Sequence, residues 1–346
     1  MSRPSYWAAK SRRLLKPALV AILMIAVVAA CSGKTPQSRE AILSNSQSAA
    51  DVRAITHAMG ETRVPVNPQR VVALLGSLDN ILALGVNPIG SADVVKPYLE
   101  DRAKGIESVG NDLEPNLETI LALKPDMILG LALASEVSIY GKLSQIAPTV
   151  LAPSEHSGEW KEVLMKQAEA LGKTEKAEQM MTDYYTRLEK FKAQMGDRLN
   201  QIQVSVVRVY PESINLYLKD SFCGTVLQDA GLSRPPSQDL DAAAAKFISG
   251  NSIQLSISKE LLEQADGDVI FLWTTGSNQE IAQQAKTALA RLKADPLWSQ
   301  LKAVKQGKVY EVPGYWIGDG PLAANAVIDD LFKYLVPSEE QQLDKE

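Results

Sequence analysis

The residues of this chain best suited to chemistry are arginines, aromatic residues and one serine that lie near the ends of predicted strands in its second half. They are Arg208, Tyr210, Tyr217, Ser221, Phe222, Arg234, Trp273, Tyr315 and Trp316. Ligands of open α/β sheets bind beyond the carboxyl ends of the strands, so we predict that these residues converge on one binding cleft. For each aromatic residue taken singly, packing in a hydrophobic core is the alternative.

The residue types needed for catalysis are scarce. Histidine occurs only at His57 and His156, in different sequence contexts, so a histidine-rich zinc or manganese pocket cannot be assembled. No Walker motif, dinucleotide fingerprint or nucleophile elbow occurs in the sequence. A hydrolase built on Cys223 would need one of the histidines as an arbitrary partner. We therefore predict a protein that is not an enzyme and that holds no cofactor or metal ion of its own.

The first thirty residues have the composition of a signal peptide. They contain basic but no acidic residues, followed by an apolar run that is too short to cross a bilayer comfortably. Val28-Ala29-Ala30 then precede Cys31 in the pattern of a bacterial lipobox, which predicts acylation of this thiol, with palmitate among the lipids, and anchoring to a membrane. Arg12-Arg13 partly match a twin-arginine signal, so the export route stays open.

The charge of the exported part is acidic. The whole chain has 36 Lys and Arg against 41 Asp and Glu, and loss of the five basic residues in 1–30 leaves 31 against 41, a net charge near −10. This balance disfavours nucleic acid as a partner. An anionic ligand would need a locally basic pocket, because the field of the whole protein would repel it. We expect a monomer.

The remaining chain divides into two similar α/β halves. Residues 31–55 are polar and predict a flexible tether, residues 56–171 an N-terminal lobe, residues 201–338 a C-terminal lobe, and residues 339–346 a polar tail. In both lobes short apolar runs alternate with helical patterns, which predicts mainly parallel, doubly wound sheets. The expected strands are 70–75, 88–92, 127–131 and 149–152, then 203–209, 215–219, 268–273 and 308–312, with a last helix at 321–335.

A long helix is predicted between the lobes, within residues 172–200. Apolar residues recur at three- and four-residue intervals from Ala177 to Met195, and no Gly or Pro interrupts the run from Thr174. Such a helix would be roughly 33 Å long, enough to lie along both lobes as a rigid spine.

An internal echo relates the two lobes. Glu118 opens a predicted short helix, and Asp126 begins an apolar strand eight residues later; Glu260 and Asp268 repeat this arrangement in the second half. A helix followed by Asp and a strand is common in α/β proteins, but the matching glutamates strengthen the case for two related lobes.

Several of these segments resemble the cobalamin and iron-siderophore binding proteins of ABC importers. The matching segments are Asn67-Pro-Gln-Arg-Val-Val72, Asn116-Leu-Glu-Thr-Ile-Leu-Ala-Leu-Lys-Pro-Asp126, the long helix, Tyr217-Leu-Lys-Asp-Ser-Phe222 and Gly320-Pro-Leu-Ala-Ala324. The resemblance extends from about His57 to Pro337. It implies two α/β lobes joined by one rigid helix, in agreement with the pattern above.

The resemblance also implies partners and a location. Members of this family carry one surface glutamate on each lobe that pairs with arginines of the permease, and these positions match Glu118 and Glu260. The expected partners are an ABC permease with its ATPase, and a membrane through the lipid anchor. The expected location is the periplasmic side of the inner membrane, or the cell-surface face of a single-membrane bacterium.

The resemblance is stronger to the siderophore branch than to the cobalamin branch. Arg208 and Arg234 would suit the anionic oxygens of a ferric siderophore. Several relatives that take highly anionic siderophores carry a basic residue where this chain has Leu131-Ala-Leu133, which favours a hydroxamate or mixed carboxylate ligand over a tris-catecholate. The alternatives are a haem or cobalamin binding protein, a chelatase-like enzyme, and a lipoprotein adhesin.

Overall fold

The computed structural model describes residues 52–92, 96–111, 114–274, 276 and 279–337. The predicted signal peptide, Cys31, most of the predicted tether and the polar tail lie outside the described residues. Within the described part, no helix combines the length and apolar character needed to cross a membrane.

A parallel five-stranded sheet forms the centre of the N-lobe, the name used here for this sheet and helices α1 to α4. Its strand order is β5-β4-β3-β6-β7. The strands are β3 (Val71–Ala73), β4 (Gly90–Ser91), β5 (Glu107–Ser108), β6 (Met127–Leu131) and β7 (Thr149–Ala152). The helices are α1 (Leu78–Ala83), α2 (Leu117–Leu123), α3 (Ala134–Ile146) and α4 (Trp160–Leu171), with 3-10 turns η1 (Pro97–Leu99) and η2 (Ser157–Glu159). The strands predicted in this half are confirmed, whereas β5 was not predicted.

A hairpin precedes this sheet and begins inside the segment predicted as tether. Strand β1 (Val52–His57) pairs antiparallel with β2 (Gly60–Pro65), and Ala58 donates a backbone hydrogen bond to Leu151 of β7. The Arg53 guanidinium fixes the start of the hairpin, because it donates to the carbonyls of Val66, at 2.8 Å, and Ala170, at 3.0 Å. The expected tether boundary at residue 55 is therefore wrong, since ordered structure begins by Val52.

The C-lobe, which comprises the second sheet and helices α6 to α9, repeats the same strand order as β10-β9-β8-β11-β12. Its strands are β8 (Val204–Val209), β9 (Ile214–Tyr217), β10 (Gln254–Ile257), β11 (Val269–Thr274) and β12 (Val309–Glu311). Its helices are α6 (Phe222–Asp229), α7 (Ala242–Ser249), α8 (Gln279–Lys293) and α9 (Lys302–Lys305), with 3-10 turns η3 (Gly196–Gln201), η4 (Lys259–Ala265), η5 (Trp298–Gln300) and η6 (Gly314–Ile317). Strand β10 was not predicted. Strand β9 runs antiparallel to β8 because only a tight turn joins them, with Tyr210 N–H donating to Ser213 at 2.8 Å.

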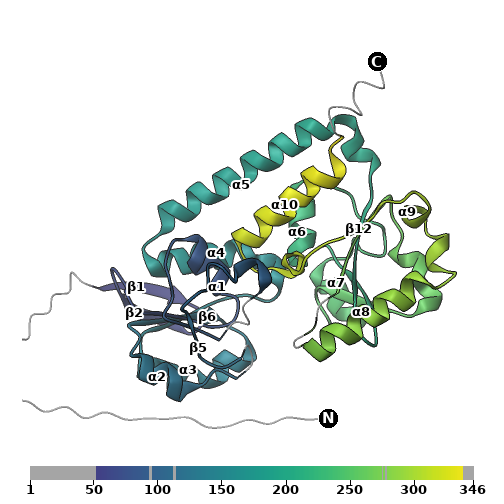
Figure 1. The fold of residues 1–346 in the computed structure, drawn as a ribbon. Helices are drawn as coiled ribbons and strands as arrows, with labels where there is room; N and C mark the ends of the chain where they lie inside the picture. The colour runs from purple at the N-terminus through teal and green to yellow at the C-terminus, as the bar shows by residue number, and fades with distance from the viewer. Residues whose placement is uncertain (1–51, 93–95, 112–113, 275, 277–278, 338–346) are drawn as a thin grey trace, which may run out of the picture. The chain divides into compact units, whose positions relative to one another are not determined.

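The predicted spine is helix α5 (Thr174–Met195), which extends from the N-lobe toward the C-lobe (Figure 1) and contributes to the cores of both. Near its start Ala177 packs in the N-lobe core, whereas Tyr184, Leu188 and Phe191 pack in the C-lobe core. The apolar stripe predicted from the sequence therefore packs into the N-lobe core at its start and into the C-lobe core along the rest of its length.

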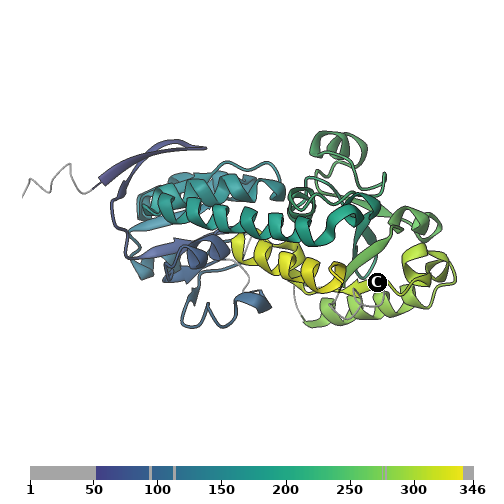
Figure 2. The same cartoon turned by 90° about the horizontal axis from the view of Figure 1, so that it is seen from above.

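A second helix, α10 (Pro321–Leu335), lies beside α5, as Figure 2 shows from above. Arg187 of α5 binds the side chains of Asn325 and Asp329 of α10, and the rings of Phe191 and Phe332 meet edge to face. Helix α10 also contacts α1 of the N-lobe. The rigid helix is thus reinforced by a second one that reaches from one lobe to the other.

Candidate functional site

Strand alternation gathers part of the predicted site on one face of the C-lobe sheet. Side chains on a strand point alternately to opposite faces, so Arg208 follows Val204 and Val206, and Trp273 follows Val269 and Phe271, on the same face. Arg208 and Trp273 are also partners in the parallel pairing of β8 with β11, near the carboxyl ends of both strands.

Two tyrosines lie against the Arg208 guanidinium, and a tryptophan lies against one of them. It donates a hydrogen bond to the Tyr217 hydroxyl at 3.0 Å and lies 4.1 Å from the centre of the Tyr210 ring. The Tyr217 ring meets the Trp273 ring edge to face, with 4.8 Å between the ring centres. Burial raises the pKa of Tyr217, so its hydroxyl stays protonated at neutral pH. We call Arg208, Tyr210, Tyr217 and Trp273 the arginine cluster.

The arginine cluster has hydrogen-bond donors without acceptors. Arg208 Nε and Trp273 Nε1 are buried, and neither has a hydrogen-bond partner among the described residues. An unpaired buried donor costs about 1–3 kcal/mol, so an oxygen-rich ligand that supplied acceptors would recover this free energy. The arrangement is chemically suited to a ligand that is anionic near Arg208 and apolar against the rings.

The structure gives Ser221, Phe222 and Arg234 contacts within the lobe. The Ser221 hydroxyl caps α6 by accepting from Gly224 N–H at 3.1 Å, and Phe222 packs in the core. Arg234 is buried and donates to the Tyr217 carbonyl at 2.6 Å, so it helps to hold the backbone of Tyr217, a member of the arginine cluster, in place. Its environment lowers the pKa of Arg234 to about 10, chiefly through burial. A direct contact of these three residues with ligand stays a prediction.

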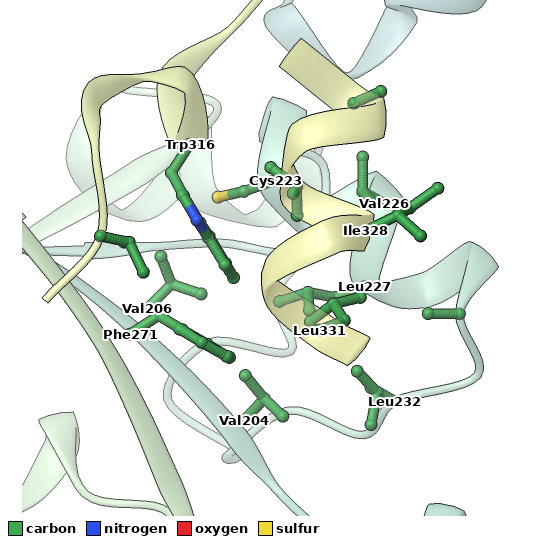
Figure 3. Close-up of a cluster of buried hydrophobic side chains, with 14 of the residues drawn as sticks. Val204, Val206, Cys223, Val226, Leu227, Leu232, Phe271, Trp316, Ile328 and Leu331 are labelled. Atoms are coloured by element: carbon green, nitrogen blue, oxygen red, sulfur yellow. The ribbon is translucent and has the colours of Figure 1, made fainter. Parts of the chain in front are cut away.

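Tyr315 and Trp316 lie on a different element, η6, and share one acceptor. Trp316 is buried in the core that Figure 3 draws, stacked on Phe271 with 4.3 Å between ring centres. Its Nε1 and the Tyr315 hydroxyl both donate to Asp330, each at 2.8 Å. Trp316 is therefore fully engaged in packing, whereas Tyr315 is partly exposed. Cys223 lies in the same core, and burial raises the pKa of its thiol.

A group of polar residues that the sequence did not predict lies where the N-lobe meets α10. The Asp79 carboxylate of α1 accepts hydrogen bonds from Leu322 N–H at 2.9 Å, Ala323 N–H at 3.1 Å and the Tyr98 hydroxyl at 3.0 Å. Beside it, Lys96 forms an ion pair with Asp319 at 2.6 Å. Burial, and then the charge of Asp319, raise the pKa of Asp79 to about 6.

A sequence signal for this contact lies in Gly320-Pro321. Helix α10 begins after Gly320, which has no side chain to cap the first N–H groups, so another residue must supply the acceptor. A Cβ atom at Gly320 would lie 2.4 Å from an Asp79 carboxylate oxygen, which explains why glycine stands there. The partner itself could not be inferred, because Asp79 is remote in sequence.

The two predicted docking glutamates occupy similar positions on their lobes. Glu118 lies in the first turn of α2 and Glu260 in the first turn of η4, and both are exposed. Hydrogen bonding by the Ser258 side chain lowers the pKa of Glu260, so its carboxylate is ionised. The role of both in docking stays a prediction.

The similarity between the two lobes extends to the aspartates that follow these glutamates. Asp126 accepts from the backbone of Gln69, at 2.7 Å, and Arg70, at 2.9 Å, just before β3. Asp268 accepts from Gln203 N–H at 2.8 Å, just before β8. In each lobe, therefore, an aspartate at the start of one central strand (β6 or β11) binds the backbone at the start of its neighbour (β3 or β8).

Comparison with known proteins identifies the family. Residues 71–315 match the sequence profile described as "Periplasmic binding protein". The chain belongs to this family. It is 33% identical to the probable siderophore-binding lipoprotein YfiY of Bacillus subtilis, over 92% of this chain and 96% of that protein. It is 30% identical to the Fe(3+)-citrate-binding protein YfmC of B. subtilis, over 87% of this chain and 90% of that protein.

A solved structure extends the likeness to the fold. The Staphylococcus aureus protein SirA complexed with staphyloferrin B matches with a TM-score of 0.71 and 28% identity, over 82% of this chain and 98% of SirA. The relatives named here are binding proteins, so this periplasmic binding protein is not an enzyme. Its two-lobed α/β fold and its family are thus those that the sequence motifs predicted.

Proposed function

We propose that this periplasmic binding protein captures a ferric siderophore and delivers it to the permease of an ABC importer. The observation that supports this most directly is the arginine cluster, where a guanidinium lies between aromatic rings and two buried donors lack acceptors. Ferric siderophores present carboxylate, hydroxamate or catecholate oxygens around an iron ion, and such oxygens are the acceptors the cluster needs. The names of YfiY and YfmC, a siderophore-binding and an Fe(3+)-citrate-binding protein, support the same class of ligand.

Within this class we favour a hydroxamate or a mixed carboxylate ligand. Arg208 supplies one guanidinium at the cluster, and β6 ends at Leu131 and is followed by Ala132-Leu133 rather than by a basic residue. A tris-catecholate with high negative charge would call for more cationic groups than this. The name of YfmC, an Fe(3+)-citrate-binding protein, is consistent with a carboxylate-bearing ligand.

Tryptophan fluorescence tests the ligand directly. The purified mature protein is titrated with iron(III) citrate, ferrioxamine B, a ferric tris-catecholate, haem and cobalamin, and Trp273→Phe serves as the comparison. We expect saturable quenching by ferrioxamine B or iron(III) citrate, reduced in Trp273→Phe. Quenching by haem or cobalamin alone would contradict the proposal.

Delivery rests on two further proposals. The acylated Cys31 holds the protein at the outer face of the membrane that contains the permease, in keeping with the word lipoprotein in the name of YfiY. Glu118 and Glu260 then orient the two lobes on the permease by charge complementarity. Reversal of both charges, Glu118→Arg with Glu260→Arg, should abolish uptake of the ⁵⁵Fe-labelled ligand while its dissociation constant stays within about twofold, because neither residue belongs to the arginine cluster. Normal uptake by this double variant would contradict the docking role.

A further inference from the structure

Two arginines of the C-lobe bind the same tyrosine. Arg208 donates to the Tyr217 hydroxyl at 3.0 Å, and Arg234 donates to the Tyr217 main-chain carbonyl at 2.6 Å. They come from separate segments, because Arg208 belongs to β8 and Arg234 lies between α6 and α7. Two guanidinium groups are therefore held close together, at the two ends of one residue.

The partners of both arginines are uncharged. Arg208 contacts the Tyr217 hydroxyl and the face of the Tyr210 ring. Arg234 donates to the Tyr217 carbonyl and to the side-chain amide of Gln238, while its Nε and Nη1 are buried and have no hydrogen-bond partner among the described residues. In the same part of the chain, every ion pair involves a base other than these two arginines.

Other partly buried bases of the molecule do have a carboxylate. Lys96 forms an ion pair with Asp319 at 2.6 Å, and Lys161 forms one with Asp229 at 2.8 Å. Removal of a charge from water costs free energy unless an opposite charge compensates it. The two arginines that share Tyr217 bear this cost without such a partner.

The charge of Arg234 is real but poorly balanced. Burial lowers the pKa of Arg234 to about 10, although nearby Cys223 and Asp239 act to raise it, so the guanidinium stays charged at neutral pH. The Asp239 side chain is exposed and lies 3.7 Å from Lys219, so water screens its charge and the lysine shares it. The arginine pair therefore leaves a net positive charge at this edge of the acidic protein.

An anionic ligand would compensate this charge. Two like charges held close together repel each other, and a negative group bound at the arginine cluster would offset the repulsion as well as the cost of burial. A charge in the protein interior is screened less than one on the surface, so Arg234 can act on a bound ligand without touching it. A neutral complex would gain little from this field, and a cationic one would be repelled.

We propose that the C-lobe selects ferric complexes with a small net negative charge, as iron(III) polycarboxylates have, and that the charge of Arg234 sets this preference together with Arg208. The inference rests on the proposed siderophore function and narrows it. Three hydroxamates only neutralise Fe(III), so a hydroxamate complex without further acidic groups does not meet this condition. A tris-catecholate carries more negative charge than two arginines balance.

The wild-type protein gives the first test. Tryptophan fluorescence follows titration of the mature protein with iron(III) citrate, which is anionic, and with ferrioxamine B, which is cationic through its free ammonium group. We expect iron(III) citrate to bind about tenfold more tightly or better, because only this complex is attracted by both arginines. A ferric tris-catecholate, titrated in the same way, should also bind less tightly than iron(III) citrate.

Substitutions of Arg234 separate its charge from its structural role. Arg234→Met removes the charge but keeps an unbranched side chain, and should weaken binding of iron(III) citrate about fivefold without weakening that of ferrioxamine B. Arg234→Lys keeps the charge and should stay within about twofold of wild type for iron(III) citrate. The control, Lys305→Met, makes the same change of formal charge at an exposed position of α9 and should bind both complexes as wild type does.

Thermal unfolding followed by circular dichroism shows whether each variant is folded. If Arg234→Met does not fold, Arg234→Gln takes its place, because its amide can still donate a hydrogen bond near the Tyr217 carbonyl. A merely structural role of Arg234 would weaken both iron complexes alike, in the lysine variant as well as in the methionine variant, and would overturn the inference. Unchanged binding of iron(III) citrate by Arg234→Met would overturn it too.

The outcomes separate this inference from the proposed function. If wild type bound ferrioxamine B or the ferric tris-catecholate as tightly as iron(III) citrate, or more tightly, the charge preference would be wrong while capture of a ferric siderophore would stand. If wild type bound haem or cobalamin alone, or none of these iron complexes, both proposals would be wrong.

Discussion

The two lobes use the same strand order but differ in the connection after their first central strand. In the N-lobe β3 is followed by helix α1 and then a parallel strand, β4, whereas in the C-lobe β8 turns directly into an antiparallel strand, β9. Helix α1 carries Asp79, which caps α10, and the turn after β8 follows Arg208 and carries Tyr210. One topological position therefore serves cohesion between the lobes on one side and proposed recognition on the other.

Among single substitutions, the largest effect is expected where the C-lobe is proposed to recognise the ligand. Arg208→Ala should weaken binding of the iron complex about 30- to 100-fold, because hydrogen bonds to a charged group contribute about 1.5–3 kcal/mol. Fluorescence titration measures this change. Arg102→Ala, at an exposed position of the N-lobe, is the control and should bind as wild type does.

A second substitution tests whether the hydrogen bond between Arg208 and Tyr217 contributes to ligand affinity rather than to the stability of the fold. Its partner Tyr217 keeps its ring in Tyr217→Phe but loses the hydroxyl that accepts from Arg208. We expect a smaller loss of affinity, about threefold to tenfold, with little change in the melting temperature. Equal affinities for Arg208→Ala and wild type would show that the ligand does not bind at this edge of the C-lobe.

The next effect concerns cohesion. Asp79→Ala removes the acceptor of two backbone N–H groups and of the Tyr98 hydroxyl, so the free energy of unfolding should fall by about 2–4 kcal/mol. Urea denaturation followed by circular dichroism measures it. Asp101→Ala, an exposed carboxylate near by, should leave the stability within about 0.5 kcal/mol of wild type. A loss no larger in Asp79→Ala than in Asp101→Ala would mean that the cap is dispensable.

The pH dependence of stability gives a second test of the contact between Asp79 and α10. Because the pKa of Asp79 is raised to about 6 in the folded state, the folded protein binds a proton that the unfolded chain does not between about pH 4 and 6. The stabilising contribution is therefore present at low pH and is lost as the pH rises through 6, by about 1–3 kcal/mol. Asp79→Asn lacks this slope, and parallel curves for wild type and Asp79→Asn would contradict it.

The sequence predicted the fold better than the site. Periodicity located α5 and most strands because buried faces repeat every two or 3.6 residues, and these repeats are local. It missed the β1–β2 hairpin, β5 and β10: Glu107–Ser108 of β5 is exposed and has no apolar residue, and β10 is only four residues long. Their pairing depends on neighbouring strands rather than on their own composition.

For the site, residue type could suggest partners but not contacts. Arg208 and Trp273 are far apart in sequence and meet only through the register of β8 with β11. Trp316 has the same residue type as Trp273, yet it is committed to Asp330 and Phe271. The contact of Asp79 with α10 joins segments that no local pattern relates, so only the tertiary structure reveals it.

The smallest expected effect concerns one edge of the N-lobe sheet. Strand β7 of the N-lobe is covered by the β1–β2 hairpin, where His57 Nδ1 accepts from Leu151 N–H at 3.2 Å and Nε2 lies 2.9 Å from Thr62 Oγ1. Burial lowers the pKa of His57, because removal from water disfavours the charged imidazolium.

The lowered pKa fixes the sign of the expected pH effect. Below about pH 6.5 the unfolded chain takes up a proton that the folded chain resists, so the contribution of His57 is present at neutral pH and is lost as the pH falls. This slope is opposite to that of Asp79. At pH 5.5 the melting temperature of wild type should therefore lie closer to that of His57→Gln than at pH 7.5, by roughly 2 °C. His156→Gln is the control, because in the described residues the His156 side chain has its ion pair with Glu159 and no hydrogen bond to the hairpin. A difference between wild type and His57→Gln that stayed constant across this range would show that the hairpin does not depend on neutral His57.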